Sequence, residues 1–356
     1  KSAQQPNGSS GGIYPRGTAG TIFQDGFLWG GKVDTTGNDV GNDIRVGGQT
    51  YNIGTIPGWV ITGGDYEDAE TADITNPLVR IYRIRPDYES LTHAMLIQDA
   101  AELNEISSSS VTTAMTQDLM DQYVLDWEEW PVEHGAPYYD MDNDGVYTYA
   151  ADGTGDLPGI AQADQVLWYV VNDYSRSATT GLYGSLPIGI ELQTTLWAYN
   201  QPGVRLGQII FKSNKIINKS GRTITDMYVS QWADPDLGSY SNDFVGCDTV
   251  LSLGYSYNGE ITDTDYDAFD LAPAAFGYDF FQGPMVESAG DTAIFELDYV
   301  PGYKNLPMTS FGWFSAGSPI SDPTLGEYEG TLQVYNLIRG YVPTEFVDAP
   351  TPWYLG

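Results

Sequence analysis

Alternating apolar and polar positions dominate the second half of the chain. Runs rich in β-branched and aromatic residues are separated there by Gly, Pro, Asn and Asp, which is the pattern of short strands joined by turns. The predicted strands cover residues 166–171, 188–199, 208–217, 223–232, 249–257, 275–281, 292–299 and 308–314. This density of strands predicts a mainly β fold whose core is an antiparallel β-sandwich or resembles a jelly roll.

Helical periodicity is visible in a central segment and again near the end of the chain. Residues 94–105 and 112–130 place apolar and aromatic side chains at helical spacing, and Pro131 ends the second helix. We interpret the aromatic stripe of the second helix as core packing rather than a ligand platform. A further short helix is predicted at residues 328–339, with Gly340 as its cap.

These patterns divide the chain into successive segments. A Gly-, Ser- and Gln-rich start and a proline-rich end favour extended backbone at both termini. The predicted segments are an extended N-terminal arm (1–20), a short-strand β region (21–85), a helical insertion (86–135), a β-sandwich domain with acidic loops (136–341) and an extended C-terminal tail (342–356).

Composition restricts the partners and the location of the protein. With 15 basic and 48 acidic residues the net charge is -33, which repels nucleic acids and anionic membranes. Apolar runs are strand-sized, so no membrane insertion is expected. The single cysteine precludes an internal disulfide, and the Gly- and Tyr-rich, Lys-poor composition is typical of secreted bacterial β-proteins. We therefore expect an extracellular or cell-surface location.

One short run suggests a specific chemistry. Asp140, Asp142 and Asp144 stand at alternate positions, and Gly145 follows directly. Alternate carboxylates converge when the backbone coils tightly around a cation, and a glycine readily takes the required turn. The carbonyl oxygen of Val146 would supply the next ligand. This pattern predicts a calcium-binding loop.

The rest of this loop departs from the helix-loop-helix calcium site. In that site a bidentate Glu closes the loop at the twelfth position, which is Ala151 here, with Asp152 next. We therefore predict a calcium loop between strands or turns, with Asp152 among its ligands. The alternative is an acidic surface turn, because Asp, Asn and Gly are common turn residues.

A second acidic cluster follows a predicted strand. It contains Asp234, Asp236, Asp243 and Asp248 on a stretch that is interrupted by Pro and Gly. Several of these carboxylates could converge on one calcium ion, although their spacing is less diagnostic. A solvated acidic loop is the alternative.

Known catalytic constellations are not apparent in the sequence. Two histidines, His93 and His134, are too few for a three-histidine zinc site, and a GxSxG motif is absent. A glycoside hydrolase needs only two carboxylates and an aromatic-lined cleft, and exposed aromatic residues could instead bind glycans without catalysis. Because the chain has 48 acidic residues, the abundance of carboxylates is no argument for catalysis.

Four stretches carry a resemblance to a known group of proteins. They are GLYGSLPIGIE (181–191), YVSQWADPDLG (228–238), YDFFQGP (278–284) and PGYKNLPMTS (301–310). Over residues 30–340 the chain resembles uncharacterised large secreted bacterial β-rich proteins of the type IX secretion cargo kind. The resemblance implies an extracellular location and supplies no catalytic residues.

Together these features predict an extracellular, calcium-stabilised structural protein. We expect it to form a filament, sheath or surface layer by self-association through its extended termini. The alternatives are a glycan-binding module and a glycoside hydrolase, both with an extracellular polysaccharide as partner. Between an enzyme and a non-catalytic protein, we favour the latter.

Overall fold

The computed structural model describes residues 11–34, 43–150, 154–295 and 298–353. The chain forms two compact units, each built from separate stretches of sequence. Unit 1 comprises Lys1–Thr55, Asp173–Ile188 and Arg222–Gly356, and unit 2 comprises Ile56–Asn172 and Gly189–Gly221. The segment 136–341, which we predicted to be one sandwich domain, is therefore shared between the two units.

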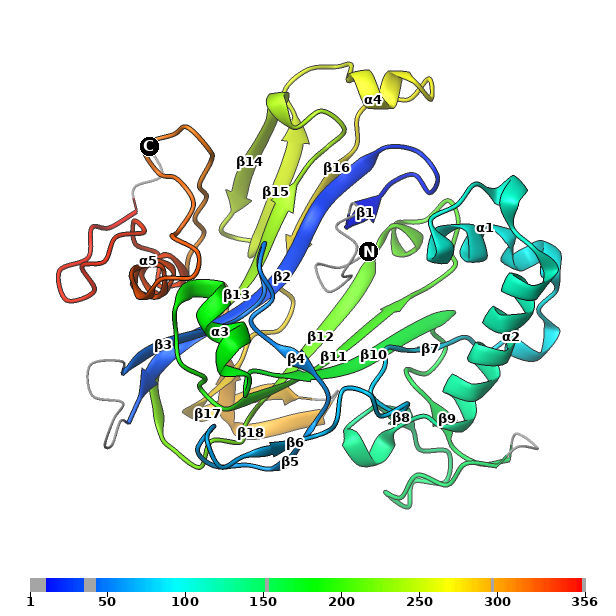
Figure 1. Ribbon diagram of the computed structural model, residues 1–356, viewed down its shortest axis with the longest axis horizontal. Coiled ribbons are helices and arrows are strands. Elements are labelled where there is room, and N and C mark those ends of the chain that lie inside the picture. The colour runs from blue at the N-terminus through cyan, green and yellow to red at the C-terminus, as the bar shows by residue number, and fades with distance from the viewer. Residues whose placement is uncertain (1–10, 35–42, 151–153, 296–297, 354–356) are drawn as a thin grey trace. The chain divides into compact units, whose positions relative to one another are not determined.

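Unit 1 contains a four-stranded sheet, a three-stranded sheet and a hairpin. The four-stranded sheet has the order β1-β2-β13, with β3 also paired to β2; the others are β14-β15-β16 and β17-β18 (Figure 1). The elements are β1 (Gly12–Ile13), β2 (Gly20–Val33), β3 (Ile44–Gly48), α3 (Arg176–Tyr183), β13 (Ile224–Pro235), β14 (Asp243–Asp248), β15 (Leu253–Asn258), α4 (Thr264–Asp267), β16 (Ala275–Asp279), β17 (Met285–Phe295), β18 (Asp298–Asn305) and α5 (Tyr328–Ile338).

Helices α3 and α5 contribute to the core of unit 1. Leu28, Val46 and Trp232 of the four-stranded sheet are buried together with Leu182 of α3 and Tyr335 of α5. Glycines in β2 make this packing possible, since a Cβ on Gly30 would lie only 2.9 Å from Cδ1 of Ile338. The helix predicted at residues 328–339 is thus confirmed as α5.

Unit 2 is built on a five-stranded antiparallel sheet of order β12-β11-β10-β4, with β7 also paired to β10. Two small hairpins, β5-β6 and β8-β9, accompany it. The elements are β4 (Ile56–Pro57), β5 (Val60–Thr62), β6 (Glu70–Thr71), β7 (Tyr82–Ile84), α1 (His93–Asn104), α2 (Thr113–Glu128), β8 (Tyr138–Tyr139), β9 (Leu157–Pro158), β10 (Gln165–Asn172), β11 (Ile190–Ala198) and β12 (Ile210–Asn218).

Both predicted central helices are present and lie side by side in unit 2 (Figure 1). The hydroxyl of Thr112 accepts a hydrogen bond from the Met115 amide at 3.3 Å and so caps the N-terminus of α2. On the inner face of α2, Leu119 and Tyr123 pack with Leu96 of α1. The apolar stripe therefore forms core, as we predicted.

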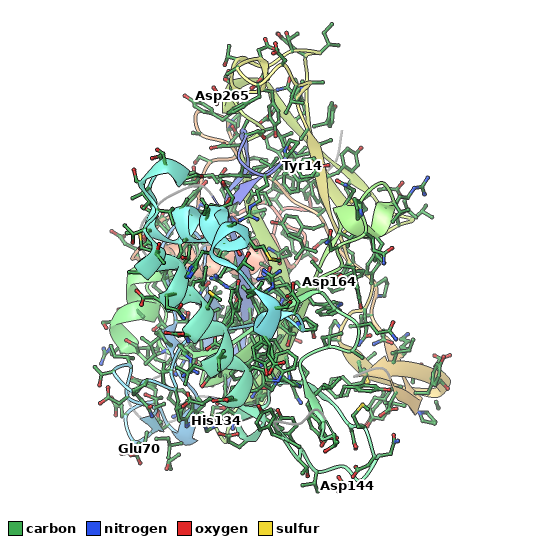
Figure 2. The ribbon with its side chains drawn as sticks, turned by 90° about the vertical axis from the view of Figure 1, so that its right-hand side faces the viewer. Tyr14, Glu70, His134, Asp144, Asp164 and Asp265 are labelled. Atoms are coloured by element: carbon green, nitrogen blue, oxygen red, sulfur yellow. The ribbon has the colours of Figure 1, made fainter. Side chains whose placement is uncertain are left out.

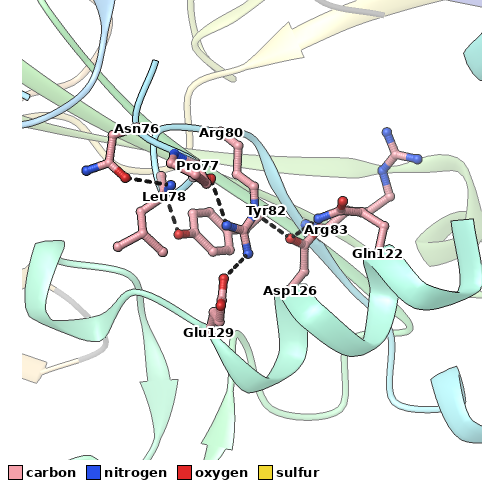
Figure 3. A network of polar contacts seen from close by, with 9 residues as sticks. All are labelled: Asn76, Pro77, Leu78, Arg80, Tyr82, Arg83, Gln122, Asp126 and Glu129. Carbon is pink, nitrogen blue, oxygen red and sulfur yellow. Dashed lines mark hydrogen bonds and ion pairs between the residues drawn. The ribbon is translucent and has the colours of Figure 1, made fainter. Parts of the chain in front are cut away.

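A buried ion pair joins α2 to the strand segment around β7. The carboxylate of Asp126 accepts hydrogen bonds from Arg80 Nε at 2.8 Å and from the Arg83 amide at 2.9 Å (Figure 3). Gln122 donates to the same carboxylate at 2.8 Å, and the second guanidinium nitrogen of Arg80 reaches Glu129 at 3.0 Å. These contacts fix the position of α2 within unit 2.

The C-terminal tail differs from the prediction of an extended segment. Its described residues fold back on unit 1: Tyr341 forms an antiparallel bridge with Pro352, and the Val342 amide donates to Thr351 O at 2.9 Å. Val347 packs against the core of unit 1. At the other end β1 pairs with β2, and residues 1–10 of the predicted arm lie outside the described residues.

The predicted fold class is confirmed. Strands predominate, every described pairing is antiparallel, and the helices are few. The sheets arise mainly from pairing of strands that follow one another in the sequence, such as β10, β11 and β12, while the pairing of β2 with β13 connects distant parts of the sequence. Among the described residues, no helix combines the length and apolarity needed to cross a membrane.

Candidate metal centre

The acidic loop lies between the two strands of a small hairpin in unit 2. Tyr139 of β8 pairs with Leu157 of β9, and the chain between them leaves and returns to this pair. The rings of Tyr138 and Tyr147 contact each other edge to face with centroids 5.2 Å apart. Figure 2 labels Asp144 on this loop. The loop is thus set between strands, as predicted, and not between helices.

Backbone amides of the loop bind its own carboxylates. Asp140 accepts hydrogen bonds from the Asn143 amide at 2.6 Å and from the Gly145 amide at 2.8 Å. Asp142 accepts one from the Asp144 amide at 3.2 Å, and Asp144 accepts one from the Val146 amide at 2.7 Å. Because a carboxylate oxygen has two lone pairs, each oxygen bound in this way can still coordinate a cation.

Two left-handed residues produce the coil. Asn143 has φ 59° and Gly145 has φ 78°. Asn tolerates this conformation better than most residues, and Gly adopts it without steric cost. The turn that we predicted at Gly145 is therefore present.

The three aspartates converge as the alternate spacing predicts. One carboxylate oxygen from each of Asp140, Asp142 and Asp144 lies within 4.8 Å of the other two. Oxygens bound to one Ca²⁺ at 2.3–2.6 Å are separated by at most about 5 Å. Within the described part of the chain, these three residues are the only such group of His, Cys, Asp or Glu side chains.

The carboxylates of the loop differ in their electrostatic environment. The Gly145 amide is the main cause that lowers the pKa of Asp140, because its hydrogen bond favours the charged form. Loss of hydration is the main cause that raises the pKa of Asp142, and the charges of Asp144 and Asp156 add to it. A cation among these groups would counter this repulsion.

Sequence reasoning missed Asp156, which holds both sides of the loop together. Its buried carboxylate, 4% exposed, accepts hydrogen bonds from the Met141 amide at 2.8 Å and the Thr148 amide at 2.7 Å. The signal was a single acidic residue directly before an apolar pair, Leu157 and Pro158. If such a residue is buried beside a strand, its carboxylate needs hydrogen-bond donors, and nearby backbone amides supply them.

Val146 and Asp152 were also predicted as ligands of this loop. Val146 follows Asp144 in the coil, and its carbonyl accepts a long hydrogen bond of 3.5 Å from the Thr148 hydroxyl. A second lone pair of that carbonyl is left for a cation. Asp152 lies outside the described residues.

The second predicted cluster does not gather around one point. Asp243 and Asp248 begin and end β14, which separates them by roughly 17 Å at about 3.3 Å per residue. Asp248 instead accepts hydrogen bonds from the Val250 and Leu251 amides at 2.9 and 3.0 Å and so stabilises the following turn. These two carboxylates therefore cannot share an ion.

Asp234 and Asp236 are partly buried near Asp243 in unit 1. The carboxylate of Asp243 accepts the Leu237 amide at 2.8 Å. Burial, together with the charges of Asp234 and Asp243, raises the pKa of Asp236 to about 6. Burial is also the largest cause that raises the pKa of Asp234, which hydrogen-bonds Tyr51. Among these carboxylates, Asp243 is thus held by a backbone amide, and Asp234 lies at the end of β13.

Both histidines take part in packing contacts. His93 Nδ1 lies 2.7 Å from the hydroxyl oxygen of Thr116, next to the start of α2. His134 stacks on Trp59 with ring centroids 3.6 Å apart, and burial lowers its pKa. His93 thus joins the first turns of α1 and α2, and His134 packs on Trp59 within unit 2.

No protein-family model, curated protein or solved structure matches the chain. Inference about function therefore depends on the geometry of the described residues. The convergence of Asp140, Asp142 and Asp144 is the feature with the most specific chemistry.

Proposed function

We propose that this chain is a calcium-stabilised structural protein that acts outside the cell or at its surface. The observation that carries the proposal is the convergence of the Asp140, Asp142 and Asp144 carboxylates within 4.8 Å. Their loop is coiled by Asn143 and Gly145 and held by backbone amides, so the acidic side chains are oriented before a cation arrives.

The ligand atoms favour calcium over other common metals. Oxygen-only ligands suit hard cations, whereas Zn²⁺ prefers nitrogen and sulfur. Mg²⁺ requires near-ideal octahedral geometry at a shorter distance, which a surface loop provides less easily than the flexible coordination of Ca²⁺. Asp142 and Asp144 are exposed, so water can complete the coordination shell. Such a site suits the millimolar calcium of an extracellular environment.

The bound ion would have a structural role. It would neutralise the repulsion among the loop carboxylates and would fix the loop between β8 and β9, which Asp156 already holds from the inside. It would also offset a small part of the net charge of -33. Two chains that approach each other would then repel less strongly.

The proposal includes self-association into a filament, sheath or surface layer, in line with a secreted cargo of the type IX pathway. The described tail residues fold back on unit 1, so we no longer assign them the role of a donated strand. Sedimentation velocity in calcium and in chelator tests this part. Larger species that form only in calcium would support it, and a monomer at high concentration in both would contradict it.

Thermal unfolding tests the calcium site. Binding to the folded state at 10 to 100 times Kd stabilises it by about 1.4 to 2.7 kcal/mol, or about 3 to 8 °C in Tm for a unit of this size. We expect this shift on replacing a chelator with calcium, and we expect Asp142→Asn to abolish it. Asp118→Asn, which removes an exposed charge from α2 of the same unit, is the matched control and should keep the shift.

A further inference from the structure

The outer face of the three-stranded sheet in unit 1 carries exposed aromatic side chains. In this sheet Phe244 of β14 pairs with Tyr257 of β15, and Tyr255 stands two residues along the same face. The exposed fractions are 55% for Phe244, 36% for Tyr255 and 45% for Tyr257. Ser256, which points to the opposite face, is only 2% exposed. The aromatic face is therefore exposed to solvent.

Glycines allow two of these rings to lie close to the backbone. A Cβ built on Gly246 would be 2.6 Å from Cζ of Tyr255, and one on Gly259 would be 2.4 Å from Cε2 of Phe244. The ring of Tyr255 thus covers Gly246, and the ring of Phe244 covers Gly259. Side chains held in this way present surface to solvent without a large loss of conformational entropy on binding.

The three rings form a continuous surface, which we call the aromatic platform. The centroids of Phe244 and Tyr257 are 5.9 Å apart with an interplanar angle of 24°. Those of Tyr255 and Tyr257 are 6.1 Å apart with an angle of 37°. At roughly 200 Å² per aromatic side chain, the exposed part is on the order of 300 Å², which is comparable to the largest apolar patch of a typical monomer.

A polar pocket adjoins one end of the platform. It has a volume of about 270 Å³ and is lined by hydroxyl, amide and carboxylate groups, among them Ser241, Asn242, Glu260 and Thr262. The connection is direct: the Gly259 amide donates to Asn242 O at 2.8 Å, and the ring of Phe244 covers Gly259. Glu260 follows in sequence, so the pocket begins where the platform ends.

We propose that the aromatic platform and this pocket bind a neutral oligosaccharide of pyranose sugars. The C–H faces of successive sugar rings would stack on Phe244, Tyr257 and Tyr255, because aromatic rings are apolar but carry a negative π-face. Hydroxyl groups of a terminal or branching sugar would donate to Glu260 and exchange hydrogen bonds with Ser241 and Asn242.

The negative charge around the platform favours a neutral glycan over an acidic one. Glu260 directly follows Gly259, which the Phe244 ring covers, Asp279 lies on the outer face of β16, and the chain as a whole carries a net charge of -33. An acidic glycan or an anionic protein surface would meet repulsion from all of these groups. Sugar hydroxyls, in contrast, are good donors to carboxylates.

Calorimetric titration of the full chain with cellohexaose, xylohexaose and mannohexaose tests the proposal. At least one of these neutral probes should bind with one site per chain. Tyr257→Ala and Phe244→Ala should each weaken binding about tenfold, whereas Tyr257→Phe should retain it. Tyr299→Ala removes another exposed tyrosine, 76% exposed on β18, and should leave binding unchanged.

A substitution in the polar pocket distinguishes loss of binding from loss of folding. The side chain of Glu260 lines the pocket, and its backbone amide donates a hydrogen bond to Asn258 Oδ1, so Glu260→Gln should fold normally. We expect this variant to bind several-fold more weakly. Titrations in chelator should give the same result, which separates this site from the calcium loop.

Several results would overturn the proposal. One is the absence of binding of all three neutral probes at millimolar concentration. Another is binding that folded Tyr257→Ala, Phe244→Ala and Glu260→Gln leave unchanged, since the rings would then serve only to cover glycines in the sheet. Tighter binding of hexagalacturonate than of the neutral probes would refute the assigned ligand class.

Discussion

Substitution of Asp126 by Ala should cause the largest loss of stability among single changes to acidic residues of unit 2. The side chain is 1% exposed and accepts hydrogen bonds from Arg80, Gln122 and the Arg83 amide (Figure 3). Removal leaves the Arg80 guanidinium, which is only 17% exposed, without its buried partner. It also leaves the Arg83 amide without an acceptor.

The magnitude follows from these contacts. Loss of one partner of a buried pair costs about 3–5 kcal/mol. Arg80 keeps Glu129 at 3.0 Å and lies 4.1 Å from the ring centroid of Tyr82, so we expect the lower end of this range, about 3 kcal/mol. Burial raises the pKa of Asp126 even though Arg80 hydrogen-bonds its charged form. Desolvation therefore offsets much of the attraction, and Arg80→Leu/Asp126→Leu should cost less than the sum of the single changes.

Urea unfolding followed by circular dichroism measures the loss, and hydrogen exchange of the Arg83 amide locates it. Glu129→Ala is the matched control, since it removes a 43% exposed partner of the same Arg80 and should cost less than about 1 kcal/mol. An equal loss of unfolding free energy in Asp126→Ala and Glu129→Ala would refute the reasoning, because the buried contact would then contribute no more to stability than the exposed one.

Three further predictions concern single positions. Because the pKa of Asp236 is raised to about 6 in the folded state, its contribution to stability is full below pH 4 and is lost as the pH rises through 6. In chelator, Asp236→Asn should therefore raise the unfolding free energy at pH 7.5 by roughly 1 kcal/mol, after allowance for solvent screening. This gain should vanish at pH 4. Asp156→Ala should destabilise unit 2 by about 2–3 kcal/mol in urea and weaken calcium binding in a titration, because two amides lose their charged acceptor; an unchanged calcium affinity would argue against its role in shaping the loop. Gly48→Ala should lower the unfolding free energy by about 3 kcal/mol or more, since φ is 115° and a Cβ would lie 2.1 Å from Phe27 O. At Gly64 φ is 121° but no atom lies near the position of a Cβ, so Gly64→Ala should show only the smaller cost of backbone strain. Equal losses of stability in thermal melts of the two variants would contradict this distinction.

Strong local periodicity explains which elements the sequence predicted well. Helix α2 has an apolar stripe, a Thr112 cap and Pro131 after its end, and the strands β10 to β12 are rich in β-branched and aromatic residues. Tertiary packing explains the failures. Helix α3 was missed because it contains three β-branched or Gly residues; a cap from Ser175 and burial of Leu182 and Tyr183 stabilise it instead.

Glycines and apolar loop residues were the other source of error. Residues 21–85 were predicted to form short strands, but Gly30 and Gly31 lie inside the 14-residue strand β2, where neighbouring side chains occupy the space of a Cβ. Residues 308–314 were predicted as a strand but form a loop, in which Phe314 packs on the core of unit 1. An apolar pattern indicates that a segment is buried, but it does not show whether the segment belongs to a sheet.

The acidic loop was predictable because its geometry is local. The spacing of Asp140, Asp142 and Asp144 and the left-handed Gly145 determine the convergence of the carboxylates over a few residues. The cluster around Asp234 could not be resolved, because β14 lies between Asp243 and Asp248 and the sequence prediction overlooked that strand. Asp156 was missed because its partners lie across the loop.

A crystal structure of the full chain grown in calcium, with an anomalous difference map, tests the central claim most directly. We predict one ion among Asp140, Asp142 and Asp144, with carboxylate oxygens at 2.3–2.6 Å and the carbonyl of Val146 or water completing the shell. A loop without an anomalous peak at 10 mM calcium, or a peak bound only elsewhere on the chain, would contradict the account.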